Sequence, residues 1–411
     1  SIFVYLFVMG LTTMSIWFLM KCKEVTQRYG YNMYAKLCFG IAGTIAMKII
    51  LIFKGLGGCC VFLRTFGGVC GQIVTSILKT DDSFYFQENF YVFLIFAVLA
   101  PLMFMRDISG LKKFSFLGVV CIFIFVICIF IKYFYQASME HSFLITSDML
   151  FPIDAGDFPS LFQKLTSLIN SYYFHMNVFP IYLPMTPRSS RNMVKATFIS
   201  CLICSIIYYL VGVTGYAMYK KDLQSSILPN IKDDLQTLIN KQGKTSLDMI
   251  MILVNFVSML TFFISALFTM PLIFFSLKTN LINLISMMKR SLVKEQTEKD
   301  IEGTQAPEPK EKSKDSVSGF VRFVITLIAY CVVLFFTLKV SQIIIINSLA
   351  GSTVGNLIST IAPATFLLML GTQSFCSFEK HTARFFIGFG TAILILFTKF
   401  QIIDVFFVKK E

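Results

Sequence analysis

The stretch of sequence that decides the fold is residues 160–185, which read SLFQKLTSLINSYYFHMNVFPIYLPM. Its apolar flanks are those of a membrane-spanning helix, which needs about 20 residues. Its middle is polar instead, and runs Asn170-Ser171-Tyr172-Tyr173-Phe174-His175-Met176-Asn177 before Pro180. A stretch this polar, with few strong helix formers, predicts a broken helix at mid-bilayer depth. Irregular backbone at that depth persists only where it lines a cavity or is covered by protein.

The composition of the whole chain supports a membrane location for nearly all of it. The 411 residues are 56% hydrophobic and 14% charged, and the mean hydropathy is +0.73. Soluble domains are near a quarter charged. The 11 cysteines fall mostly inside apolar runs, so no disulfide framework is indicated. These values exclude a cytosolic enzyme, a disordered protein and a secreted disulfide scaffold, and they predict an all-α polytopic membrane protein.

Ten apolar segments are candidate spans, and the polar stretches between them leave no room for a soluble domain. The longest polar stretch, 288–317, is rich in Glu, Lys and Pro, and it is predicted to be a charged, flexible cytoplasmic loop. The candidate spans are residues 1–20, 40–78, 90–105, 115–135, 160–185, 196–219, 247–277, 318–338, 342–371 and 385–407.

The distribution of lysine and arginine predicts how the chain is oriented. The net charge is +13, but the basic residues lie in short segments between the apolar runs, with no stripe that alternates with exposed aromatic residues. Nucleic acid is therefore not predicted as a partner. Placing residues 21–36, 106–113 and 288–317 in the cytoplasm gives that side roughly twice as many basic residues as the other, as the positive-inside rule requires. The C-terminus then lies on the opposite side.

Two spans carry a stripe of polar side chains that ends at a proline. The first stripe, in 247–277, consists of Ser258, Thr261, Ser265 and Thr269, followed by Pro271. The second, in 342–371, consists of Ser352, Asn356 and Ser359, followed by Pro363, and the wider polar set of that span also holds Asn347, Ser348, Thr353 and Thr360. Hydroxyls beside carbonyls that a proline has freed suit a dehydrated Na⁺ or a polar substrate group. Packing between helices through small residues explains the stripes equally well.

Four basic residues lie within spans, namely Lys48, Lys54, Arg64 and Lys399, and Arg64 is well inside its span. Arg64, in 40–78, is costly there unless it is paired, and its candidate partners are a substrate carboxylate, a water-filled vestibule or a neighbouring subunit. Motifs for covalent catalysis or nucleotide hydrolysis are absent, since the chain has no phosphate-binding loop, no zinc-protease motif and no nucleophile elbow. The sequence therefore does not indicate an enzyme.

Residues 174–228 resemble the amino acid/auxin permease family, and in particular its sodium-coupled neutral amino acid transporter branch. The matching residues are His175, Pro180, Ile181, Tyr182, Arg191, Gly215, Tyr216 and Tyr219. Shorter matches are Gly57-Gly58-Cys59, the basic loop at residues 107–115 and Thr269-Met270-Pro271. The acidic pair that the family carries after Pro-Ile-Tyr is absent, because Leu183-Pro184 stands there.

The resemblance implies eleven helices, arranged as a five-plus-five inverted repeat with one extra helix. On that plan residues 1–287 hold helices two to eight and residues 318–411 hold helices nine to eleven, so ten of the eleven are visible. The chain opens with Ser1 already inside an apolar run, and we expect the first helix of the plan to be missing from this sequence. That helix would be the second broken helix of the implied fold.

The resemblance also implies a secondary active transporter that moves amino acids, neutral ones in particular, by alternating access. It implies no cofactor besides a coupling ion, Na⁺ or H⁺, between which the sequence does not decide. The alternative is a non-transporting family member that serves as a scaffold or sensor subunit of a membrane complex. The membrane, plasma or organellar, is not specified. The candidate substrate-binding residues are Gly57, Gly58, Ser171, Phe174, His175 and Asn177, and the candidate ion-binding residues are Ser265 and Thr269.

Overall fold

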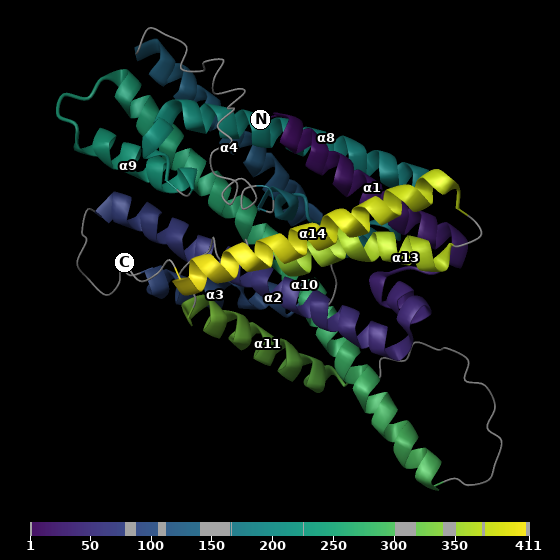
Figure 1. Cartoon of the computed structure of the whole chain (residues 1–411). Coiled ribbons are helices and arrows are strands. Elements are labelled where there is room, and N and C mark those ends of the chain that lie inside the picture. Colours follow the sequence, from purple (N-terminus) through teal and green to yellow (C-terminus); the bar gives the residue numbers. More distant parts are fainter. Residues whose placement is uncertain are drawn as a thin grey trace.

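A computed structural model describes residues 2–78, 88–105, 112–139, 165, 167–224, 226–300, 318–339, 351–371 and 375–407 (Figure 1). These residues are largely helical and include no strand, which confirms the all-α class. The main helices are α1 (Ile2–Thr26), α2 (Tyr31–Leu78), α3 (Glu88–Met103), α4 (Lys112–Met139), α8 (Ser190–Tyr219), α9 (Ile227–Asn240), α10 (Ser246–Asp300), α11 (Gly319–Lys339), α13 (Ala362–Leu370) and α14 (Ser377–Phe407). Shorter helical segments are η3 (His175–Asn177), α7 (Val178–Tyr182), η4 (Lys220–Asp222), η5 (Gly351–Gly355) and η6 (Leu357–Ile361).

The helices have the length and surface of membrane spans. Within the described residues, 7 helices are long and apolar enough to cross a membrane, and α3 contributes a shorter apolar helix. Each predicted span contains helical residues within the described part of the chain. Large apolar side chains face outward on them, for example Phe116, which is 72% exposed, and Ile395, which is 68% exposed. The chain is therefore an integral, multi-pass membrane protein.

The two longest helices, α2 and α10, form the centre of the bundle (Figure 1). They approach closely because α2 presents glycine to α10: a Cβ at Gly55 would lie 2.9 Å from the Cβ of Leu277. Small residues at helix contacts allow such an approach between helices in lipid. The helices α3, α4 and α11 pack around this pair. The rings of Phe96 on α3 and Tyr330 on α11 stack with centroids 4.0 Å apart.

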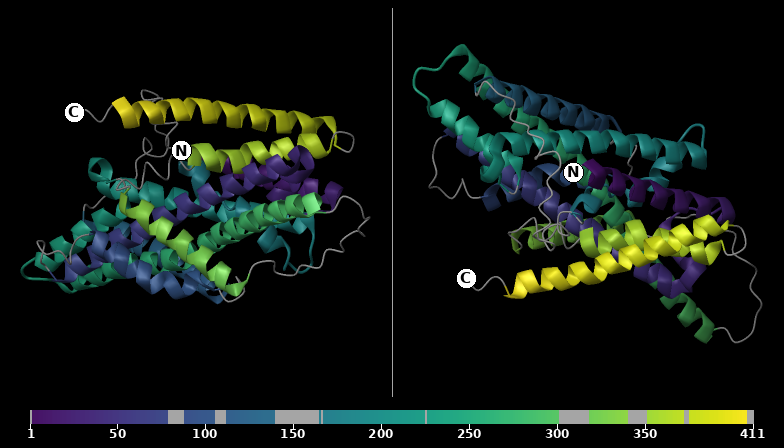
Figure 2. Two further views of the ribbon diagram at one scale, coloured as in Figure 1. Left: turned by 90° about the horizontal axis from the view of Figure 1, so that it is seen from below. Right: turned by 45° about the horizontal axis from the view of Figure 1, so that its top comes forward.

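A second group of helices lies along α1. Helix α1 runs beside α8, and α13 packs against both α1 and α14, which lies along the outer edge of the bundle (Figure 2). On the five-plus-five plan, α1 and α8 are the second and seventh helices, while α2 and α10 are the third and eighth. Helices at equivalent positions of the two halves therefore contact each other, as expected for two interlocked inverted repeats.

Two helix boundaries differ from the sequence-based prediction. Helix α10 continues to Asp300, so residues 288–300 of the predicted flexible loop are helical, and residues 301–317 lie outside the described residues. The Glu, Gln and Lys residues of this stretch are strong helix formers, and they extend a helix that the span has already nucleated. Helix α2 begins at Tyr31, ahead of the predicted start, and bends at Gly40, whose φ of 67° favours glycine.

The predicted span 342–371 is described from residue 351 onward, so Asn347 and Ser348 of its polar set lie outside the described residues. The segments η5 and η6 are π-helical turns that precede α13. The prediction that the residues of the polar stripe share one face assumed regular α-helical geometry, and π-helical turns do not keep that geometry. Pro363 supplies a physical reason, because it has no N–H to complete an α-helical hydrogen bond to the carbonyl of Ser359. Such π-helical turns are frequent at functional sites.

Candidate functional site

The structure confirms the broken helix within residues 160–185. The helical residues before the break end at Ser171, residues 172–174 are not helical, and η3 and α7 follow. Phe174 has φ −136° and ψ 13°, outside the helical region. The residues after the break pack in one apolar cluster with residues of α1, α2 and α13. The break is therefore covered by protein, which is the condition for irregular backbone at this depth.

A hydrogen-bonded chain joins the break to two other segments. His175 is only 1% exposed, and its Nε2 lies 3.1 Å from Oγ of Ser15 on α1. The Ser15 hydroxyl donates its hydrogen to the carbonyl oxygen of Ser359 in η6. Because a hydroxyl has one hydrogen to donate, the Ser15 oxygen accepts from the Nε2–H of His175. This bond therefore places a hydrogen on Nε2 of His175, and in the neutral ring Nδ1 carries a lone pair.

The carbonyls of η6 are available for these bonds for a local reason. In an α-helix the carbonyl of Ser359 would accept from the residue four positions later, which is Pro363 and has no N–H. The carbonyl of Ile358 also accepts from outside its own helix, from the hydroxyl of Tyr31 at 3.1 Å. Hydroxyls of α1 and α2 thus satisfy carbonyls of the π-helical turns, and they fix these segments relative to one another.

Lys54 faces the same break from α2 and is 6% exposed. Its ammonium group hydrogen-bonds to the amide oxygen of Asn170 and lies 4.4 Å from the centre of the Tyr173 ring. One amide oxygen and one aromatic ring are weak compensation for a buried positive charge. Within the described ranges, no Asp or Glu forms an ion pair with Lys54. The position therefore favours an anionic ligand.

Two further polar atoms at the break have no hydrogen-bond partner among the described residues, namely Nδ1 of His175 and the hydroxyl of Tyr173. A buried polar group without a partner costs roughly 1–3 kcal/mol. Such atoms mark where water or a ligand binds. The two rings are neighbours, with centroids 5.6 Å apart. We refer to the following set as the central polar cluster: Ser15, Lys54, Asn170, Tyr173, His175 and Ser359.

The predicted glycine pair lies next to this cluster on α2. Gly57 and Gly58 follow Lys54 by three and four residues, so all three share one helix face. A Cβ at Gly58 would lie 3.2 Å from Cγ2 of Ile273 on α10. The contact recorded for Gly58 is thus a helix–helix contact, and a role of the pair in substrate binding stays a prediction.

The remaining predicted substrate residues belong to the break. Ser171 is exposed, and its hydroxyl bonds to the carbonyl of Ser167 at 3.0 Å. Phe174 packs against the apolar cluster around α1. The backbone N–H of Asn177 donates to the carbonyl of Phe174 at 2.8 Å, which closes the turn of η3. Among the predicted substrate residues, the side chain of His175 bonds to Ser15 on α1, and the backbone carbonyl of Ser171 accepts from the hydroxyl of Tyr208 on α8 at 3.4 Å.

The predicted ion-binding residues lie on α10, and no recorded contact joins them to the central polar cluster. The hydroxyl of Thr269 donates to the carbonyl of Ser265 at 3.0 Å, within its own helix. A Cβ at Gly118 of α4 would lie 3.6 Å from that same carbonyl oxygen. These contacts are those of helix packing, and ion binding stays a prediction. Across the described ranges, no three His, Cys, Asp or Glu side chains gather in a metal site.

Sequence reasoning did not single out Ser15 and gave Lys54 no role. A lone hydroxyl in an apolar helix usually bonds to its own backbone, so nothing in the sequence marked Ser15 as a bond between helices. The available signal for Lys54 was its spacing from Gly57, which places it on the face of the glycine pair. Arg64 instead donates to the amide oxygen of Asn89 on α3 at 2.8 Å. No recorded contact brings Arg64 to the central polar cluster.

These features define a class: a polytopic membrane protein with a polar centre at a broken helix, which is the architecture of secondary transporters. The family described as transmembrane amino acid transporter protein matches residues 1–403. The chain belongs to this family, as the motifs around His175 predicted. The family consists of transporters and not of enzymes, which agrees with the absence of catalytic motifs from the sequence.

Named relatives are amino acid transporters. The chain is 26% identical over 300 residues to "Amino acid transporter AVT6C" of Arabidopsis thaliana, with 69% of this chain and 64% of that protein covered. It is 24% identical over 376 residues to "Vacuolar amino acid transporter 2" of Saccharomyces cerevisiae, with 89% of this chain and 69% of that protein covered. "Putative sodium-coupled neutral amino acid transporter 8" of Xenopus tropicalis matches 36% of the chain at 26% identity. The chain spans 55% to 66% of the length of three Arabidopsis relatives.

Proposed function

We propose that the protein is a secondary active transporter of amino acids that works by alternating access. The observation that carries the proposal is the central polar cluster, where a buried lysine without a carboxylate partner in the described residues faces a broken helix with unpartnered polar atoms. Membership of a family of amino acid transporters supports the substrate class. Broken helices are where transporters of this architecture bind their substrates.

The chemistry of the cluster matches the two charged groups of an amino acid. The ammonium of Lys54 suits the substrate carboxylate, since charge-assisted hydrogen bonds are the strong ones. The hydroxyl oxygen of Tyr173, which has no partner among the described residues, accepts a hydrogen bond from the substrate ammonium group. Lys54 is the one formally charged side chain of the cluster, and the carboxylate uses it. A charged substrate side chain would have no partner there, so we propose neutral amino acids as substrates.

For the coupling ion we propose H⁺. The lone pair on Nδ1 of His175 is a proton acceptor inside the cluster. The hydroxyl of Thr269, by contrast, bonds within its own helix. Coupling to Na⁺ through Ser265 and Thr269 is the alternative. Proton coupling requires that uptake respond to a pH gradient and remain when Na⁺ is replaced by choline.

Uptake by the purified full chain in liposomes tests the proposal. Radiolabelled alanine and glutamine would be supplied with a pH gradient, a Na⁺ gradient or neither. We expect saturable uptake that is driven by the pH gradient and is competed by other neutral amino acids. Saturable uptake driven by Na⁺ alone would overturn the proposed ion but keep the substrate class. Absence of saturable uptake under every gradient, from folded protein, would favour the scaffold or sensor role.

A further inference from the structure

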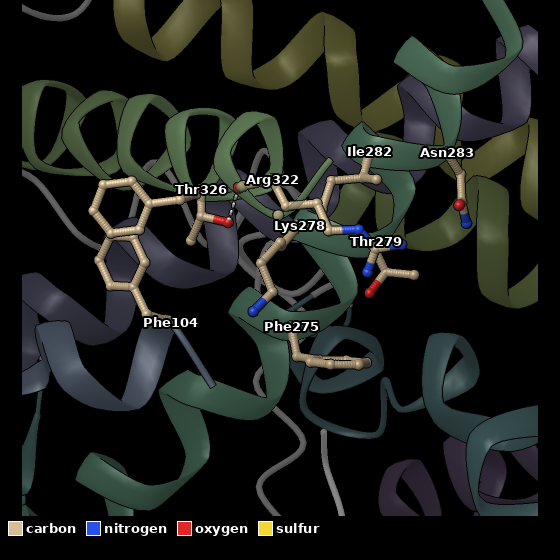
Figure 3. Close-up of a pocket in the computed structure, with 10 residues that line it drawn as sticks. Phe104, Phe275, Lys278, Thr279, Ile282, Asn283, Arg322 and Thr326 are labelled. Carbon is tan, nitrogen blue, oxygen red and sulfur yellow. Dashed lines mark hydrogen bonds between the residues drawn. The ribbon is translucent and has the colours of Figure 1, made fainter. Parts of the chain in front are cut away.

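A cavity of about 410 Å³ lies between α10 and α11, beside the end of α3 (Figure 3). It is separate from the central polar cluster, because no member of that cluster lines it. Among the described residues that line it, two are cations and two carry hydroxyls, all from α10 and α11, and none is Asp or Glu. The residues that carry the argument are Phe104, Phe275, Lys278, Thr279, Arg322 and Thr326.

Lys278 places a positive charge in the wall of the cavity. Its side chain is buried, with an exposure of 7%, and its Nζ donates to the carbonyl oxygens of Met103 at 3.0 Å and Met105 at 2.6 Å. These carbonyls lie at and just after the C-terminal end of α3, where the carbonyls of a helix need partners from outside it. An ammonium group has three hydrogens, so one donor remains. The two carbonyls hold the ammonium group in position, and its full charge remains.

Arg322 adds a second positive charge from the first turn of α11. In Figure 3 its side chain extends toward α10, where Thr279 lies. The hydroxyl of Thr326 donates to the backbone carbonyl of Arg322 at 2.7 Å and faces the same cavity. A guanidinium group is planar and pairs with phosphate through two parallel hydrogen bonds. Two like charges that line one cavity repel each other, and an anion between them stabilises both.

The opposite part of the cavity is aromatic. The rings of Phe104 and Phe323 stack with centroids 4.8 Å apart, and Phe323 is 50% exposed. The cavity lies where spans end on the side that the charge distribution assigns to the cytoplasm. Cations beside apolar rings at that level match the boundary between lipid headgroups and acyl chains.

We propose that this cavity binds a phosphate group, carried either by an anionic lipid headgroup or by a soluble phosphate monoester. A phosphate monoester has close to two negative charges and three acceptor oxygens. Lys278 and Arg322 supply the matching charge, and the third hydrogen of Lys278, the guanidinium group of Arg322 and the hydroxyl of Thr279 supply donors. A carboxylate has one charge and two oxygens, so it would leave part of the site unused. A bound phosphate joins α10, α11 and the end of α3, and it is independent of the transported substrate.

Thermal unfolding of the purified full chain in detergent tests this proposal. The probes are dioctanoyl phosphatidic acid, dioctanoyl phosphatidylcholine and glycerol 3-phosphate, each titrated while the unfolding temperature is recorded. We expect phosphatidic acid to raise the unfolding temperature, with half-saturation shifted about tenfold to higher concentration in Arg322→Gln. The matched control, Arg384→Gln, removes an exposed arginine of α14 that does not line the cavity. For this control variant, the half-saturating concentration of phosphatidic acid should equal that of the unchanged protein.

The probes separate the two sources of phosphate. If phosphatidic acid raises the unfolding temperature and glycerol 3-phosphate does not, the bound phosphate belongs to a lipid headgroup. If both raise the unfolding temperature equally, it belongs to a soluble ligand. The proposal is overturned by the same rise with phosphatidylcholine, by no rise with any probe, or by equal titrations of the two arginine variants. Thr279→Val keeps both charges and serves as a second variant if Arg322→Gln does not fold. We expect its half-saturation to increase about threefold.

Discussion

Lys54 and Lys48 show how the surroundings of a residue, more than its type, decide its role. Both are buried lysines on α2. The ammonium of Lys48 donates to the backbone carbonyl of Asn283 on α10 at 3.1 Å, away from the central polar cluster. The ammonium of Lys54 meets only an amide oxygen and an aromatic ring in the recorded contacts. The two residues form a matched pair for mutagenesis on one helix.

Replacing Lys54 with methionine should remove the anchor of the substrate carboxylate. Charge-assisted hydrogen bonds contribute roughly 1.5–3 kcal/mol, which corresponds to about 10- to 100-fold in affinity. We therefore expect Lys54→Met to raise the KM for neutral amino acids by at least about tenfold. The measurement is the concentration dependence of uptake in liposomes. The control Lys48→Met should stay within about threefold of the unchanged protein, since the hydrogen bonds it removes, to Asn283 and Met287, lie outside the cluster. Equal effects of the two variants would refute the anchor.

The hydroxyl of Ser15 should matter more for stability than a single exposed hydroxyl does. Ser15→Ala leaves both the Nε2–H of His175 and the carbonyl of Ser359 without their partner. We expect a loss of about 1–3 kcal/mol, measured as a lower unfolding temperature. The control Thr13→Val lies on the same helix and removes a hydroxyl that bonds only to the carbonyl of Met9, so it should change stability by less than about 0.5 kcal/mol. Indistinguishable variants would mean that the bond between the segments adds nothing.

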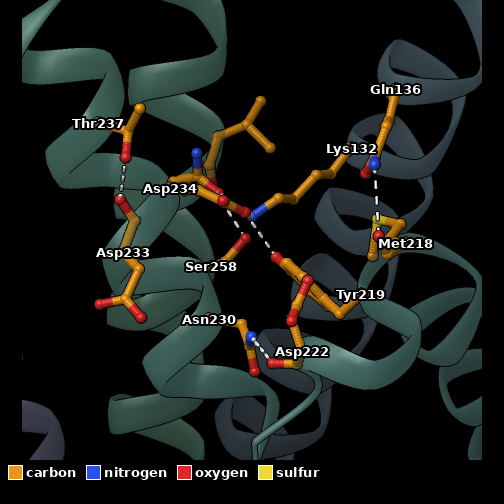
Figure 4. Close-up of polar contacts among 12 residues, drawn as sticks. Lys132, Gln136, Met218, Tyr219, Asp222, Asn230, Asp233, Asp234, Thr237 and Ser258 are labelled. Carbon is orange, nitrogen blue, oxygen red and sulfur yellow. Dashed lines mark hydrogen bonds and ion pairs between the residues drawn. The ribbon is translucent and has the colours of Figure 1, made fainter. Parts of the chain in front are cut away.

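Helix α9 illustrates what sequence patterns do not reveal at the level of elements. It lies at the end of the bundle opposite the predicted cytoplasmic loops, and the side chains of Lys132, Asp234 and Tyr219 converge there from α4, α9 and α8 (Figure 4). The ammonium of Lys132 lies 2.5 Å from Oδ2 of Asp234 and donates to the amide oxygen of Asn255 on α10. The hydroxyl of Tyr219 donates to the same carboxylate at 2.7 Å. This network fixes α9 to three spans.

Breaking this network should loosen α9. Lys132 is 6% exposed, so Asp234→Asn leaves a buried charge poorly compensated. The side chain of Asp234 is 40% exposed, which lowers the expected loss to about 1–2 kcal/mol of stability. The matched control Asp233→Asn removes a neighbouring carboxylate that contacts the exposed Gln224, and it should change stability by less than about 0.5 kcal/mol. Thermal unfolding reports both values.

The double variant Lys132→Met with Asp234→Asn supplies a further check. Removing both charges removes the uncompensated one, so the double variant should be more stable than Asp234→Asn alone. A double variant whose loss is the sum of the two single losses would show that the ion pair does not couple α9 to α4.

Some helices and breaks could be predicted from the sequence and others could not, and the difference has physical reasons. The spans were predictable because hydrocarbon demands long apolar helices, and the break was predictable because eight mostly polar or aromatic residues interrupt one. The extension of α10 to Asp300 was not predictable, because a charged stretch of sequence is equally compatible with a loop and with a solvent-exposed helix. The π-helical turn of η6 was not predictable either, because hydroxyls of α1 and α2 that lie far away in the sequence bond to its carbonyls.

For the whole molecule, composition and charge predicted the class and orientation, but not which helices touch. That the glycines of α2 pack on α10 depends on the arrangement of the two halves, which no local pattern contains. The central polar cluster has the same origin. His175 was predicted as a site residue from its own span, whereas Ser15 and Lys54 joined it through tertiary packing.

The orientation of the bundle can be tested with two introduced cysteines. Arg191 lies at the start of α8 on the predicted cytoplasmic side, and Lys244 lies in the loop between α9 and α10; both are exposed. Because α8 crosses the membrane once between them, a membrane-impermeant maleimide applied to sealed vesicles should label Arg191→Cys and Lys244→Cys from opposite sides. The natural Cys376, which is exposed just before α14, should label from the side of Arg191→Cys.

The labelling also decides where the phosphate cavity lies. The cavity is lined by residues 275–283 of α10, where its apolar segment ends, and on the charge-derived orientation this level of the helix shares the side of Arg191. Labelling of Arg191→Cys from the cytoplasmic side would place Lys278 and Arg322 next to the anionic inner leaflet, where basic residues are attracted. Labelling of Arg191→Cys from the opposite side would invert the bundle and contradict the positive-inside orientation. A lipid headgroup from the cytoplasmic leaflet would then be excluded as the occupant, because the cavity would face the other leaflet.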